Sequence, residues 1–175
     1  VNKRARRYVS VGQGDVILDN VKVDGRTVVR GGGTQSIIIK GNSDISKIII
    51  AKVDGKVRVL VEGNADVEIV YVGVDDIILT GSFGAVEVGA DASVQAVGAA
   101  INKIELTGAG AELAIDTKSS VNTLNVATAA AGSEIDVAGK VGTLNVNAEI
   151  KVDNKGTIST ANINANDVIL DGKQP

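Results

Sequence analysis

One short apolar pattern recurs along this chain at a nearly constant interval, and it constrains the fold more than any other feature. The pattern is a triplet in which two apolar residues flank a polar one, and the centres of successive triplets lie 17 to 20 residues apart. A period near 20 residues that tolerates small changes in loop length is typical of a solenoid of stacked coils. The six triplets are Val67-Glu68-Ile69, Val86-Glu87-Val88, Ile104-Glu105-Leu106, Leu124-Asn125-Val126, Leu144-Asn145-Val146 and Ala161-Asn162-Ile163.

A second set of short apolar strands precedes the first set in each repeat and recurs every 15 to 22 residues. Gly or Asn follows most of these strands, as expected for corners that need a positive φ. Val and Ile fill 46 positions against 8 Leu, and β-branched residues favour strands. We therefore predict an all-β chain that forms a parallel β-helix of about eight coils, each of 15 to 22 residues. The second set comprises residues 16–18, 37–39, 57–59, 77–79, 94–96, 113–115, 135–137, 150–152 and 168–170.

The repeats also predict the domain organisation. Residues 1–11 are a basic lead-in or an N-terminal cap, and residues 12–175 form a single β-helix domain. Residues 168–172 open a further coil that repeats residues 16–19, so we expect the chain to be a module excised from a longer protein. No apolar run approaches the roughly 20 residues that a membrane span needs, and we expect no membrane insertion.

The N-terminal third resembles a known family. Residues 14–25, GDVILDNVKVDG, are followed by Val29-Arg30-Gly31-Gly32-Gly33 and Ser36-Ile37-Ile38-Ile39. This stretch is similar to the β-helical regions of Gram-positive bacterial cell-surface proteins, which often accompany S-layer-homology anchoring domains. The resemblance is good over about residues 12 to 65. The later coils share only the general repeat pattern. The resemblance implies a right-handed β-helix and an extracellular location at the cell surface, and it transfers no catalytic residues.

Charge is distributed unevenly along the chain. Residues 1–58 hold 12 Lys and Arg against 5 Asp, whereas residues 59–175 hold 6 Lys against 16 acidic residues. Sequence position maps onto height in a solenoid, so the rod is predicted to be basic at one end and acidic along the rest. This gradient either serves solubility alone, or directs end-to-end self-association or binding of an anionic cell-wall polymer. The candidate ligands for an anionic polysaccharide are Arg26, Arg30, Lys52, Lys56 and Arg58.

Nucleic acid is not an expected partner, because aromatic residues do not alternate with the basic ones and the overall pI is near 5.0.

A possible cation site comes from three of the triplet centres. Glu68, Glu87 and Glu105 are predicted to occupy outward positions in three successive coils, about 5 Å apart. Like charges at that spacing repel. Either the carboxylates splay into solvent, with Lys103 neutralising Glu105 and Glu87, or a cation such as Ca²⁺ lies between them.

The last three triplet centres form a different surface. Thr123-Leu124-Asn125, Thr143-Leu144-Asn145 and Thr160-Ala161-Asn162 predict a flat array of Thr and Asn. Some ice-binding proteins present such arrays. Stacked Asn side chains also stabilise solenoids by hydrogen-bonding to one another along the axis, and this structural interpretation is preferred.

An apolar stripe is predicted on the opposite column of strands. Ile17, Ile38 and Ile78 occupy outward middle positions there, interrupted by Arg58. Outward aliphatic residues indicate a covered face. The cover is either a neighbouring domain or subunit, including a face-to-face copy, or the chain's own segment Tyr8–Val11.

Catalysis has little support in the composition. The chain has no Cys and no His, which excludes thiolate metal sites, Ser-His-Asp triads and Cys-His pairs within it. Some β-helices are polysaccharide lyases, and the candidate acids here are Asp75-Asp76 and Asp136 beside Lys151. Neither has an Arg or aromatic partner in adjacent coils. We therefore predict a non-enzymatic structural or interaction module, with carbohydrate binding as the alternative and a lyase third.

Overall fold

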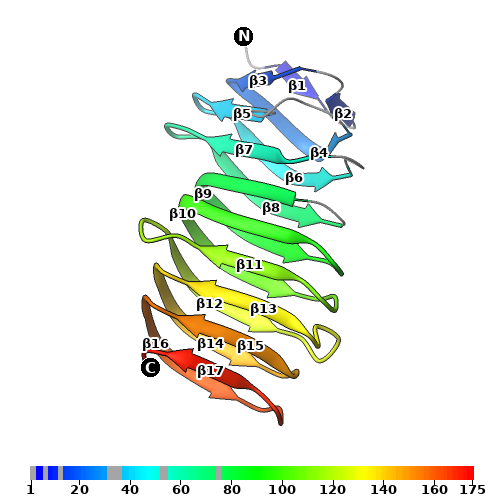
Figure 1. Ribbon diagram of the computed structural model, residues 1–175. Coiled ribbons are helices and arrows are strands. Elements are labelled where there is room, and N and C mark those ends of the chain that lie inside the picture. Colours follow the sequence, from blue (N-terminus) through cyan, green and yellow to red (C-terminus); the bar gives the residue numbers. More distant parts are fainter. Residues whose placement is uncertain (1–2, 6–7, 12–13, 31–36, 52–54, 74–75) are drawn as a thin grey trace.

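The chain forms a parallel β-helix, confirming the predicted fold class. The computed structural model describes residues 3–5, 8–11, 14–30, 37–51, 55–73 and 76–175, and this part of the chain contains strands but no helix. Its 17 strands belong to one continuous sheet in which the paired strands run parallel. Figure 1 shows the coils stacked from the N-terminus to the C-terminus. The stack has about seven turns.

Each coil contributes one strand to each of two layers that enclose the core. The first layer contains β3 (Val16–Asp19), β5 (Ile37–Lys40), β7 (Val57–Val61), the first part of β9 (Asp76–Val88) and of β10 (Ser93–Leu106), β11 (Glu112–Ile115), β13 (Ser133–Val137), β15 (Ile150–Asn154) and β17 (Ile169–Gly172). The second layer contains β1 (Lys3–Ala5), β2 (Tyr8–Val11), β4 (Val21–Val29), β6 (Asp44–Ile50), β8 (Asp66–Val72), the second part of β9 and β10, β12 (Ser120–Val126), β14 (Lys140–Val146) and β16 (Thr157–Ile163).

The N-terminal segment is part of this stack. Strands β1 and β2 lie within the predicted lead-in or cap, and both pair with β4, so that Lys3 lies opposite Val21 and Tyr8 opposite Arg26.

Rows of stacked aliphatic side chains form the core. One row in the second layer runs through six coils in direct register, and each of its side chains is completely buried. Side chains of a strand alternate between its two faces. An inward-facing position that recurs in every coil therefore gives a continuous column of contacts. The row comprises Ile48, Val70, Val86, Ile104, Leu124 and Leu144.

The corners need residues that tolerate unusual backbone conformations. Asn20 has a φ of 54°, and Gly81 has a φ of 102°. A Cβ on Gly81 would also lie 2.1 Å from the carbonyl oxygen of Val61 in the preceding coil. Glycine is therefore required there for both conformation and space.

Buried corner serines bond one coil to the coil before it. The Ser43 Oγ accepts from the N–H of Val21, the Ser119 Oγ from Ala99 and the Ser133 Oγ from Ala111, at 2.9 to 3.2 Å. Backbone donors left unpaired at a corner would cost free energy, so these bonds stabilise the stack.

A carboxylate organises one of these corners. Asp116 Oδ1 accepts hydrogen bonds from the Ser119 hydroxyl at 2.5 Å and from the N–H groups of Gly98 and Lys118 at 3.1 Å. Partial burial alone would raise the pKa of Asp116, but these hydrogen bonds outweigh it and hold the pKa below its usual value.

Candidate functional site

The expected row of three glutamates is wrong, because the register between β8 and β9 differs from the one predicted. Tyr71, not Glu68, lies opposite Glu87. Strand β8 contains a second apolar triplet around Tyr71, which supplies the buried Val70 and Val72, whereas Glu68 lies exposed before it. The prediction placed the first of two consecutive triplets, residues 67–69, in the row that residues 70–72 occupy.

Two of the glutamates do lie side by side. Glu87 is opposite Glu105, and both are half-buried. The Lys103 ammonium lies 3.0 Å from Glu105, and the Asn125 amide donates to the same carboxylate at 2.9 Å. Neutralisation by Lys103 is therefore confirmed for Glu105. Among the residues that the structure describes, no group of three or more acidic side chains is placed to hold a metal ion.

The Thr and Asn triplets stack as predicted. Thr123, Thr143 and Thr160 are in register, and so are Asn125, Asn145 and Asn162. The Asn145 amide donates to Asn125 at 2.7 Å, and Asn162 donates to Asn145 at 2.7 Å. Each Asn thus bonds to its counterpart in the preceding coil, which supports the structural interpretation of this surface.

The five predicted basic ligands are not gathered on one face. Arg26 lies exposed in β4 of the second layer, and Arg30 is exposed at the end of that strand. Arg58 lies half-buried in β7 of the first layer, two residues after the exposed Lys56. Lys52 lies outside the described residues. A ligand on one layer therefore reaches at most part of this set.

A cation that the sequence analysis missed lies next to Arg26. Lys47 in β6 is opposite Arg26 in register, and its Nζ lies 5.8 Å from the centroid of the Tyr71 ring. The parallel row on the same layer is apolar: Val28, Ile49 and Tyr71 are in register. Lys47 follows Arg26 by 21 residues, within the repeat spacing, so the period itself could have identified it.

The apolar stripe differs from the predicted one at two positions, because Ile78 lies opposite Arg58 in a separate row and Thr80 follows Leu60. Leu60, rather than Arg58, lies opposite Ile38, so Ile17, Ile38 and Leu60 form an uninterrupted row. Ile17 is 56% exposed, and the other two are half-buried. Segment Tyr8–Val11 does not cover this row, because it pairs with β4 in the other layer.

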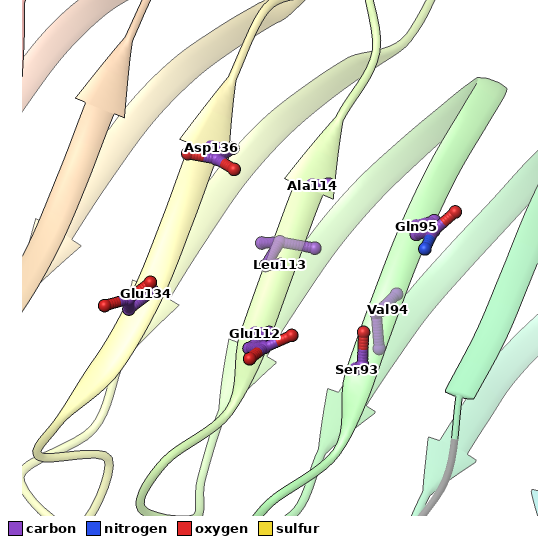
Figure 2. Close-up of a pocket in the computed structure, with 8 residues that line it drawn as sticks. All are labelled: Ser93, Val94, Gln95, Glu112, Leu113, Ala114, Glu134 and Asp136. Carbon is purple, nitrogen blue, oxygen red and sulfur yellow. The ribbon is translucent and has the colours of Figure 1, made fainter.

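A shallow hollow of about 290 Å³ lies further along the first layer (Figure 2). Ala114 lies between Gln95 and Asp136 in the same row, so its small side chain leaves a notch between longer neighbours. Glu112 and Glu134 lie side by side at the edge of this notch. The hollow is open to solvent and acidic, which suits a cationic group rather than a sugar acid.

The candidate acids of the lyase alternative are placed differently from the expected arrangement, in which Asp136 lies beside Lys151. Lys151 lies opposite Glu134, whereas Asp136 lies opposite Asp153. Asp153 is bound by Lys155, with 2.5 Å between oxygen and nitrogen. Asp76 is exposed at the start of β9, and Asp75 lies outside the described residues.

Comparisons with known proteins give no family for this chain: no family model matches it, and no similar protein was found among curated proteins or solved structures. The described part of the chain contains no helix long and apolar enough to cross a membrane.

Proposed function

We propose that this chain is a rigid rod that acts as a non-enzymatic spacer or interaction scaffold in a bacterial cell-surface protein. The observation that carries the proposal is the continuity of its ladders. Every neighbouring pair of coils shares backbone hydrogen bonds, buried aliphatic rows and, in the C-terminal half, side-chain hydrogen bonds between Asn residues.

Rigidity follows from how each coil is held. A coil that tilted relative to its neighbour would separate both layers of the sheet and open the core at the same time. Interiors packed at this density resist such deformation. At about 4.8 Å per coil, seven turns span roughly 35 Å, which is a useful length for holding two domains apart.

The proposed location rests on the resemblance of residues 12–65 to β-helical regions of Gram-positive surface proteins. The partners in such a setting would be a cell-wall polymer or neighbouring surface domains. Self-association, end to end or face to face, would extend the rod or widen it.

The absence of cysteine makes the rod easy to test with spin labels. Glu68 and Ser159 are both exposed and lie in the same row at the bend of the second layer, five coils apart. We expect labels on Glu68→Cys and Ser159→Cys to give one narrow distance distribution. Its centre should lie near the roughly 24 Å between the two backbones, with an offset for the label linkers.

Each single-label variant serves as the control, since it reports any signal from association of two rods. A broad or multiple distance distribution in the double variant, with coils still folded by circular dichroism, would show that the stack bends and would end the rigid-spacer proposal.

A further inference from the structure

Two cations on the outer surface of the second layer are stacked directly on one another. Arg26 in β4 lies opposite Lys47 in β6, so their backbones are about 4.8 Å apart. Both side chains point outward, because the next residue of each strand, Thr27 or Ile48, is completely buried. Like charges placed across adjacent strands destabilise a sheet.

Four other lysines of the described coils have acidic partners, in contrast to these two. Lys22 is paired with Asp44 and Asp24, Lys40 with Asp19 at 3.7 Å, Lys103 with Glu105 and Lys155 with Asp153. Among the residues that the structure describes, neither Arg26 nor Lys47 forms an ion pair. The fold therefore leaves a stacked pair of positive charges uncompensated.

The surroundings hold this pair in place and strengthen its field. The Tyr71 ring attracts the Lys47 ammonium through a cation–π contact. Beside the two cations lie Val28, which is 7% exposed, and the half-buried Ile49. Apolar neighbours exclude water on one side, and charge interactions are stronger where the local dielectric constant is low.

We propose that Arg26 and Lys47 form a binding site for the carboxylate groups of an acidic polysaccharide. The planar guanidinium of Arg26 matches a carboxylate through two hydrogen bonds, and the Lys47 ammonium supplies a second positive charge one coil away. A single exposed site of this kind binds weakly, and the repeated carboxylates of a polymer raise the effective affinity.

Charge along the rod favours such a polymer over nucleic acid. The row that contains Ile49 and Tyr71 continues into Glu87 and Glu105, so the favourable surface is only a few coils long. DNA carries one charge per about 1.7 Å and would meet these glutamates at full charge density. A polymer with one carboxylate per sugar places fewer charges against them.

The test measures binding of the 175-residue chain to polygalacturonate by isothermal titration in 50 mM and in 500 mM salt. We expect Arg26→Gln and Lys47→Gln each to weaken binding about tenfold, as follows from losing one charge-assisted hydrogen bond. Lys47→Arg should retain most of the affinity. High salt should weaken binding by the wild type.

The matched control is Lys140→Gln, which removes one exposed positive charge from the same layer five coils beyond Lys47. Its affinity should equal that of the wild type. Absence of binding, an equal loss in the control, or tighter binding to double-stranded DNA than to polygalacturonate would each overturn the proposal. Melting temperatures of all variants show whether folding is intact, and the spin-label distance tests the rigid rod separately.

Discussion

The two halves of the second layer use the same core but treat polar groups in opposite ways. In the C-terminal half, Asn125, Asn145 and Asn162 direct their amides at one another and satisfy their hydrogen bonds within the rod. In the N-terminal half, Arg26 and Lys47 are stacked without any partner of opposite charge among the described residues. The comparison teaches that one core can support two kinds of surface: polar groups that bond within the rod, and charges left available for the binding that we propose.

The largest effect should be common to both halves. Ile48→Ala and Leu144→Ala each open a cavity in the same buried row, and each should lower the free energy of unfolding by about 2–5 kcal/mol. Urea unfolding measures both, with the half-buried Thr143→Ala as the control of small effect. If Ile48→Ala cost far less than Leu144→Ala, the core would not be equally tight in the two halves.

The next effect belongs to the C-terminal half alone. Asn145→Ala removes one hydrogen bond to each neighbouring coil and should cost about 1–3 kcal/mol. Asn166→Ala, at an exposed position, is the control. An unchanged melting temperature for Asn145→Ala would show that the Asn row contributes nothing to stability.

A smaller effect depends on pH. Hydrogen bonds hold the pKa of Asp116 below its usual value of 3.8, so this carboxylate contributes stability above the pKa of the unfolded chain. That contribution is lost as the pH falls through the lowered folded-state pKa. Asp116→Asn should therefore be less stable than the wild type at neutral pH and should lose less on acidification below pH 4. Thermal melts from pH 7 to pH 2 measure the difference, and parallel curves for the two proteins would contradict it.

The smallest effect should have the opposite sign. Arg26→Glu replaces repulsion of Lys47 by attraction and should stabilise the chain by about 0.2–1 kcal/mol. Arg30→Glu makes the same change in net charge at an exposed position without a paired cation, and serves as the control. Equal stabilisation by both variants would mean that only the net charge of the chain matters. Repulsion between Arg26 and Lys47 would then contribute nothing measurable to stability.

The sequence predicted the architecture because a core position must repeat in every coil. Leu124 and Leu144 are 20 residues apart in the sequence and lie opposite one another in successive coils. The repeat can therefore be recognised from the sequence alone. Local register was harder to predict. Strand β8 offers apolar triplets around both Glu68 and Tyr71, and only the fit of Val70 and Val72 into the core decides between them.

Surface pairs depend on that register and were predicted unevenly. The Thr and Asn rows were placed correctly across steps of 20 and 17 residues, because each of their coils offers one such triplet. The glutamate row crosses the irregular step between β8 and β9 and was not. The repeat spacing could have placed Lys47 opposite Arg26, but only the structure shows that neither cation forms an ion pair with a described residue.

The Asn row also gives the rod an electrical direction. Every amide donates toward the preceding coil, so the side-chain dipoles align with their positive ends toward the N-terminus. Glu105 closes that positive end with a carboxylate, as acidic residues do at the N-termini of helices. Aligned hydrogen bonds polarise one another, so each added amide strengthens the ones before it. A row of neutral side chains thereby acts as a small macrodipole parallel to the rod axis, built without a helix.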